Sequence, residues 1–219
     1  MTDATLPPTM ALARAIWRDH RVWLASVLIL VGLTLVDPGP ASEQSRETLA
    51  EGLAEEGHEL SDVDRILVTH PHMDHFGDAA AIAAESGAEV CAHTDAVEWL
   101  ADPDAQFERE QELFEPFLVS MGLPERLGDT VISLPETYRD FRDPVTIDRE
   151  LEEGDTVDAG VDLEVVHTPG HAPGSVCFLA AGEALFTGDH LLGHISPNPL
   201  LTTRPGDPDE RTRSLPDYL

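Results

Sequence analysis

The sequence contains no lysine and little basic charge of any kind. Its 13 basic residues are all arginines, its acidic residues number 42, and its formal net charge is -29. Self-repulsion of this size weakens a compact state at low salt and is screened at high salt. We therefore expect an acidic protein from the cytoplasm of a salt-loving (halophilic) microbe. The same charge argues against nucleic acid as a partner, because phosphate binding needs clustered Lys or Arg.

Cysteine is scarce too, and sequence repeats are missing. Cys91 and Cys177 are the two cysteines, so no disulfide framework can be read, and neither lies in a C-x-x-C pattern. We interpret both as small apolar residues of the core. No period of about 20–50 residues recurs, which argues against a repeat array. A chain of 219 residues suits one domain.

The sequence also lacks an apolar run long enough for a comfortable membrane span. Residues 22–36 imitate a signal peptide or anchor, but Gly32 breaks the run and no small-residue cleavage site follows. We interpret the run as two core strands, 27–31 and 33–36, joined by a tight turn at Gly32. No membrane partner is therefore expected. Residues 1–21 form a poorly patterned lead-in to the domain, which covers 22–219.

Helix and strand patterns alternate along the domain, which indicates an α/β layer structure. A segment at 102–144 has apolar residues at helical spacing and is interpreted as a helical lid or insertion, with simple packing as the alternative. The second half is mostly sheet. Strands are predicted at 65–69, 89–92, 145–147, 156–158, 163–166, 176–179 and 184–187, and helices at 42–57, 77–85 and 94–100.

Three histidines and one aspartate fall within the six residues His70-Pro71-His72-Met73-Asp74-His75. His70 and His72 are two residues apart at the end of a predicted strand, so their imidazoles project to the same side. The turn that follows brings Asp74 and His75 toward a neighbouring point. Imidazole and carboxylate groups are ligands suited to Zn²⁺, with Fe or Mn possible. The segment therefore predicts a metal site.

Two further ligand groups follow predicted strands. His171 lies in Thr168-Pro169-Gly170-His171-Ala172-Pro173-Gly174-Ser175, whose prolines and glycines fix a rigid turn. Asp189 follows the apolar strand at 184–187. Open α/β sheets gather their sites at such carboxyl ends of strands. The three segments are therefore expected to meet at one site.

In combination, these motifs resemble the metallo-β-lactamase superfamily, most closely its hydroxyacylglutathione hydrolase (glyoxalase II)-like branch. The resemblance implies a four-layer αββα sandwich. It implies a first metal ion on His70, His72 and His171, a second on Asp74 and His75, and Asp189 bridging both. The matching elements are Leu35-Val36-Asp37-Pro38-Gly39, the segment Thr69 to Asp78, the segment Thr168 to Ser175, and Thr187-Gly188-Asp189.

The chain departs from the family pattern at its C-terminal end. The family completes the second metal position with a further His some tens of residues after the bridging acid, but no His follows His194. The family also continues with another strand and helix, whereas this chain ends at Leu219. We therefore expect missing C-terminal elements and a truncated reading frame, with a His in a Gly-rich context encoded downstream. One or two zinc ions are expected.

Four other residues are expected near the metal ions. Asp37 is expected to order the loop beneath them, and His167 to pack under the site. His190 and His194 lie in the loop past the bridging acid and are candidates for substrate contact. Asp74 is the expected catalytic residue, because it would orient the attacking hydroxide or pass a proton to the leaving group.

The resemblance implies hydrolysis of a small-molecule thioester or lactone by a metal-activated hydroxide. Three alternatives stay open at this point. The first is a metal-dependent phosphodiesterase or ribonuclease, and the second is a mononuclear iron enzyme of the persulfide dioxygenase type. The third is a truncated fragment that binds metal but is inactive. The sequence does not indicate the oligomeric state.

Overall fold

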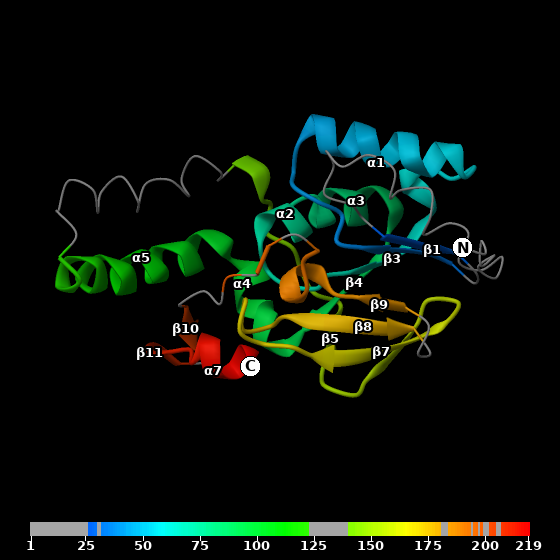
Figure 1. The fold of residues 1–219 in the computed structure, drawn as a ribbon. Coiled ribbons are helices and arrows are strands. Elements are labelled where there is room, and N and C mark those ends of the chain that lie inside the picture. Colours follow the sequence, from blue (N-terminus) through cyan, green and yellow to red (C-terminus); the bar gives the residue numbers. More distant parts are fainter. Residues whose placement is uncertain are drawn as a thin grey trace.

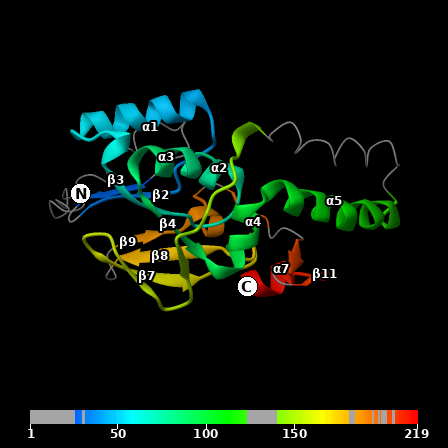
Figure 2. The same cartoon turned by 180° about the vertical axis from the view of Figure 1, so that it is seen from behind.

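The computed structural model describes residues 26–29, 32–122, 140–180, 184–193, 195–196, 198, 202–204 and 207–219. The predicted lead-in at 1–21 and His194 lie outside these residues. Two β-sheets face one another, and helices cover the outer side of the first sheet (Figure 1). Figure 2 shows the same layers from behind.

The first sheet has the strand order β1, β2, β3, β4, β5. Its strands are β1 (Ser26–Ile29), β2 (Leu33–Val36), β3 (Val63–Leu67), β4 (Glu89–His93) and β5 (Arg149–Leu151). The β1–β2 pair is antiparallel and the others are parallel. The predicted antiparallel pairing of two strands around Gly32 is present, because Ile29 pairs with Leu33. The first strand is described over Ser26–Ile29, and residues 30–31 of the predicted strand at 27–31 lie outside the described residues. The parallel strands place the loops after β3 and β4 at one edge of the sheet.

The predicted strand at 145–147 is wrong. Val145 is only 4% exposed, but its backbone N–H donates to the carbonyl of Leu100 in a loop rather than to a neighbouring strand. The strand begins further along, at Arg149, which pairs with Cys91. The apolar pattern at 145–147 therefore reflects burial in a loop and not a β-strand.

The second sheet is antiparallel throughout and has the order β6, β7, β8, β9. Its strands are β6 (Thr156–Asp158), β7 (Asp162–His167), β8 (Val176–Ala180) and β9 (Ala184–Phe186). The first four residues of β7 alternate between exposed and buried, as expected for a sheet with one face on the core and one face toward water. The turn between β7 and β8 carries His171.

The helices of the first half are α1 (Glu43–Glu55), α2 (Met73–Phe76), α3 (Ala79–Ser86), α4 (Val97–Ala101) and α5 (Pro103–Ser120). The side chain of Ser42 caps α1 by accepting a hydrogen bond from the backbone N–H of Ser45, as the sequence predicts. Helices α1 and α3 lie over the first sheet, whereas α5 extends outward from the body (Figure 1). Helix α5 makes up most of the described residues of the segment at 102–144, of which 140–144 are also described.

The core has two parts. One lies between the first sheet and the helices and includes Leu35, Ile66, Phe76 and Ile82. The other lies between the two sheets and includes Cys91 and Phe178. Cys91 and Cys177 are both buried free thiols, which confirms their interpretation as core residues.

The chain ends with the β10 (Thr203–Arg204) and β11 (Asp207–Arg211) hairpin and the short helix α7 (Ser214–Tyr218). Helix α7 contacts the β7–β8 turn: Gly170 has a φ of +125° and a Cβ there would collide with Tyr218. None of the helices in the described residues is both long enough and apolar enough to cross a membrane.

Candidate metal centre

The predicted ligand residues meet at one end of the sandwich. His70 and His72 follow β3, Asp74 and His75 lie on α2, and His171 lies in the β7–β8 turn. Asp189 lies on the single 3-10 turn that follows β9, over Gly188–His190. The backbone also ties these segments together, since the N–H of Val176 donates to the carbonyl of Thr69. Segments about a hundred residues apart in the sequence therefore form one site.

His70, His72 and His171 form the first group of potential ligands. One ligand atom from each lies within 4.8 Å of the others. Nε2 of His171 is 2.9 Å from Nδ1 of His72, and the rings of His70 and His72 meet edge to face at 4.6 Å. Two of these residues are buried and one is partly buried. These are the three residues that the family resemblance assigns to the first metal ion.

Asp189 lies between this group and His75. One of its carboxylate oxygens is 3.5 Å from Nε2 of His171, and the other is 3.4 Å from Nε2 of His75. The carboxylate of Asp74 is 3.9 Å from Nε2 of His75. The three residues predicted for the second position, Asp74, His75 and Asp189, are therefore adjacent.

The far sides of the imidazole rings are held by hydrogen bonds. Thr69 donates its hydroxyl proton to Asp37 at 2.6 Å, so its oxygen accepts from Nδ1 of His70 at 2.9 Å. Nδ1 of His75 donates to Asp37 at 2.9 Å, and Nδ1 of His171 donates to the carbonyl of Asn198 at 2.9 Å. When the rings are neutral, these bonds leave the Nε2 lone pairs facing the centre.

Asp37 is the hub of this network. Besides His75 and the Thr69 hydroxyl, it accepts a hydrogen bond from the backbone N–H of Thr69 at 2.7 Å. Its own backbone has a φ of +55°, and its N–H donates to Leu67. Asp37 also lies with His70 and His75 in a second group whose ligand atoms are within 4.8 Å. Because its carboxylate already accepts three hydrogen bonds, its geometry is that of a residue that orients the ligands.

The charges of the site depend on burial and on the neighbouring groups. Burial, together with the nearby His75, lowers the pKa of His70 well below its usual value. Burial and His171 lower the pKa of His72 to about 3. Burial disfavours the charged form of His75 as well. The charge of Asp37 and the hydrogen bonds to Asp189 and Asp37 have the larger combined effect, and the pKa of His75 is raised to about 10. Burial opposes ionisation of Asp189, yet the hydrogen bond and charge of His75 lower its pKa.

The residues present fit a divalent cation. Nε2 of His70 is fully buried and has no hydrogen-bond partner among the described residues. An unsatisfied buried nitrogen is costly unless something accepts its lone pair. Neutral imidazoles beside carboxylates are the donors that Zn²⁺ and similar ions prefer. His70, His72 and His171 would hold the first ion, and Asp189 would reach it.

The loop around His171 is supported from behind by His167. Nε2 of His167 donates to the carbonyl of Pro173 at 3.0 Å, and the ring stacks on His93 at 3.9 Å. This contact is the packing beneath the site expected for His167. The β7–β8 turn also needs Gly170, whose backbone conformation and close contact with Tyr218 exclude a larger residue.

His190 lies beside the site without joining it. Its Nδ1 is buried and has no hydrogen-bond partner among the described residues, and its carbonyl accepts a hydrogen bond from the hydroxyl of Tyr218 at 2.9 Å. It belongs to neither group of ligand atoms described above. His194, its predicted companion in the substrate loop, lies outside the described residues.

Two features of the site escaped the sequence analysis. His93, Asp95 and His167 form a third cluster with ligand atoms within 4.8 Å. Nδ1 of His93 accepts from the N–H of Asp95, and Nε2 of His167 donates to Pro173, so hydrogen bonds already engage these nitrogens. The second feature is the carbonyl of Asn198, which orients His171. Neither has a local motif that signals it.

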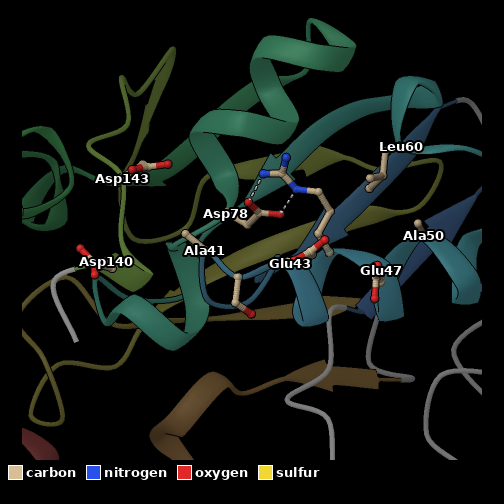
Figure 3. Close-up of a pocket in the computed structure, with 10 residues that line it drawn as sticks. Ala41, Glu43, Glu47, Ala50, Leu60, Asp78, Asp140 and Asp143 are labelled. Carbon is tan, nitrogen blue, oxygen red and sulfur yellow. Dashed lines mark hydrogen bonds and ion pairs between the residues drawn. The ribbon is translucent and has the colours of Figure 1, made fainter. Parts of the chain in front are cut away.

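A pocket of about 630 Å³ lies behind the metal loops, between α1 and the segment at 140–143. Asp78, labelled in Figure 3, lies in this pocket. Its buried carboxylate accepts two hydrogen bonds from the guanidinium of Arg46. The backbone N–H of Asp78 donates to the carbonyl of Gly39, and that of Gly39 donates to His75. The ion pair therefore anchors α1 to the loops that position His75 and Asp37.

Comparison with known proteins agrees with this geometry. Residues 22–216 match the family model of the metallo-beta-lactamase superfamily. The chain therefore belongs to this superfamily, which is a class of metallo-hydrolases, and has its α/β fold. The sequence-based expectation of the superfamily and its fold is confirmed.

The chain matches only part of the length of its individual relatives. It is 30% identical to the probable metallo-hydrolase YqjP of Bacillus subtilis over 187 residues, covering 85% of this chain and 57% of that protein. It is 29% identical to the thioesterase pkgB of Emericella nidulans over 161 residues, covering 73% of this chain and 33% of that protein.

Among solved structures, a metallo-beta-lactamase family protein of Thermus thermophilus superposes with a TM-score of 0.73 at 30% identity. The match covers 88% of this chain and 60% of that one. The chain thus spans about three fifths of the length of this relative and of YqjP.

Proposed function

We propose that this chain is a metal-dependent hydrolase that cleaves a small-molecule thioester or lactone. The observation that carries the proposal is the convergence of His70, His72 and His171, with Asp189 within 3.5 Å of His171. In this proposal these residues would hold the first divalent cation, preferably zinc. Asp74, His75 and Asp189 would hold a second.

A bound zinc ion lowers the pKa of water and polarises an ester carbonyl, so no Ser or Cys nucleophile is needed. Residues of the chain position the ligands and transfer the proton of the attacking water. Asp74 is partly exposed beside His75, and we assign it to accept the proton of the attacking water and to pass it to the leaving thiolate or alkoxide. Asp37 keeps His75 fixed through its 2.9 Å hydrogen bond.

Two observations favour an ester-like substrate over a nucleic acid. The related fungal protein pkgB is named as a thioesterase. The net charge of -29 makes the chain a poor partner for a long polyanion. The motif resemblance to the glyoxalase II-like branch points the same way.

We also propose that the segment at 102–144, which includes α5, is an insertion beside the site, and that the protein is cytoplasmic.

The proposal is tested by metal analysis combined with a substrate panel. Purified chain is assayed for bound Zn, Fe and Mn and for turnover of a thioester, a lactone, a phosphodiester and a persulfide. We expect zinc and turnover of the thioester or lactone. His72→Ala should abolish both, whereas His58→Ala, a change on the surface near Asp62, should preserve them.

Three results would overturn the proposal. They are full metal content in the His72→Ala variant, a single iron with oxidation of a persulfide, and cleavage of the phosphodiester alone.

A further inference from the structure

A second pocket, of about 520 Å³, lies between the turn that carries His171 and the C-terminal segment of the chain. One side is lined by Pro169 and Pro173, which flank His171 in the sequence, and by His167. The other side comes from β10, β11 and α7. Its lining residues there are Arg204, Arg211, Thr212, Arg213 and Asp217.

The charge of this pocket is unlike that of the rest of the molecule. The whole chain has 13 arginines against 42 acidic residues, yet three arginines line this one pocket beside two aspartates, Asp95 and Asp217. Each of the three arginines is exposed. A positive cavity in a strongly acidic protein attracts small anions locally, because field lines concentrate in clefts.

The local backbone brings these arginines together. Arg211 ends β11 and Arg213 is the N-cap of α7 two residues further on, and both line the pocket. Arg204 lies on β10, the strand that pairs with β11. Each guanidinium has five N–H donors in a planar fork. It can therefore bind a neighbouring residue and a ligand oxyanion at the same time. A carboxylate or phosphate that presents two oxygens to one guanidinium forms two parallel hydrogen bonds and binds more tightly than a single oxygen.

The pocket adjoins the candidate metal centre through a single turn. Pro169, Pro173 and His167 line the pocket, while His171, in the same turn, faces His72 and Asp189. Helix α7, which carries Asp217, contacts the turn where Gly170 meets Tyr218. A molecule whose reacting group lies at His171 could thus place a charged tail between the turn and the arginines.

We propose that this pocket binds the oxyanion tail of the substrate, a phosphate or carboxylate carried on the thiol half of the thioester. The inference rests on the proposed thioester function and narrows its substrate class to anionic thiol carriers. Arg204, Arg211 and Arg213 bind the oxyanion.

The test measures ligand binding apart from turnover. Isothermal titration of the metal-loaded full chain uses inorganic diphosphate and, separately, the dicarboxylate glutarate. We expect at least one of the two to bind, and each Arg→Gln change to weaken that binding about tenfold. The Arg149→Gln variant is the control, since Arg149 lies on β5 and binds the carbonyl of Thr156. Raising salt should weaken binding as well.

Acyl-coenzyme A and acyl-glutathione then distinguish a phosphate tail from a carboxylate tail. The preferred ester should show a KM raised about tenfold by Arg213→Gln with little change in kcat, because the tail lies away from the reacting atoms.

The outcomes separate this proposal from the proposed function. Binding that depends on the arginines, without thioester turnover, would sustain the anion site while refuting the function. Turnover with equal binding of diphosphate and glutarate by the wild type and the triple Arg→Gln variant would refute the anion site. Absence of binding of both anions by the wild type would also refute it.

Discussion

The carboxylate of Asp37 accepts a hydrogen bond from Nδ1 of His75 at 2.9 Å and fixes the orientation of that ring. The same carboxylate holds Thr69, which in turn holds His70. We therefore expect Asp37→Asn to loosen both rings and to weaken metal binding about 10- to 100-fold. Metal competition against a chelator measures the change.

The matched control for this variant is Asp162→Asn, at an exposed position on β7. It should leave metal affinity unchanged. An unchanged affinity in Asp37→Asn itself would show that the network does not position the ligands.

The ion pair of Arg46 and Asp78 supports the same loops from the opposite side (Figure 3). The Asp78 side chain is 2% exposed, while that of Arg46 is 40% exposed. Removing Arg46 leaves a buried carboxylate without its cation, so Arg46→Ala should lower the free energy of unfolding by about 1–3 kcal/mol. Solvent screening of the exposed guanidinium keeps the loss below that of a fully buried pair.

Urea denaturation measures this loss of stability. Glu47→Gln, on the same helix and in the same pocket, is the control and should stay within about 0.5 kcal/mol of the wild type. Equal stability of Arg46→Ala and the wild type would rule out an anchoring role for the pair.

The grouping of the candidate metal ligands could be predicted from the sequence because most of them are close together in it. The segment from His70 to His75 places four ligand groups on one strand end and one helical turn. His171 and Asp189 were predictable from a rigid Pro/Gly turn and a strand end, both local features. The hairpin at 32 was predictable because a glycine interrupts two apolar runs.

Other features depend on contacts between distant segments. His93 and His167 stack because β4 and β7 belong to sheets that face one another, and no spacing in the sequence encodes that contact. Residue 145 is apolar because it packs under α4 in a loop, which produces the same pattern as a strand. The arginine pocket likewise forms only once the C-terminal hairpin lies against the His171 turn.

Glu110 on α5 predicts a pH-dependent stability. Burial raises its pKa to about 8, and its Oε1 has no hydrogen-bond partner among the described residues. The unfolded chain ionises this group near its ordinary value of 4.5, whereas the folded chain keeps its proton to about pH 8. The contribution of protonated Glu110 to the free energy of unfolding is therefore fully present below pH 4.5. It is lost progressively as the pH rises toward 8.

Glu110→Gln removes this ionisation. The variant should be more stable than the wild type by about 1–3 kcal/mol at pH 8, and the gain should shrink toward pH 4.5. Thermal denaturation at both pH values measures the difference. Glu108→Gln, at an exposed position on the same helix, should show no such trend. A Glu110→Gln variant whose gain is independent of pH would contradict the assignment.

The net charge of -29 leads to the last prediction, that salt stabilises the fold. Raising KCl from about 0.1 M to about 2 M shortens the screening length from roughly 10 Å to below about 3 Å, so the repulsion among surface carboxylates is largely removed. The Tm should therefore rise with KCl. Neutralising the exposed acids Glu108, Glu112 and Asp162 to Gln and Asn should raise the Tm at low salt and reduce its salt response, because part of the repulsion is already gone. A Tm that falls with KCl, or a salt response unchanged in the triple variant, would show that charge repulsion does not limit this fold.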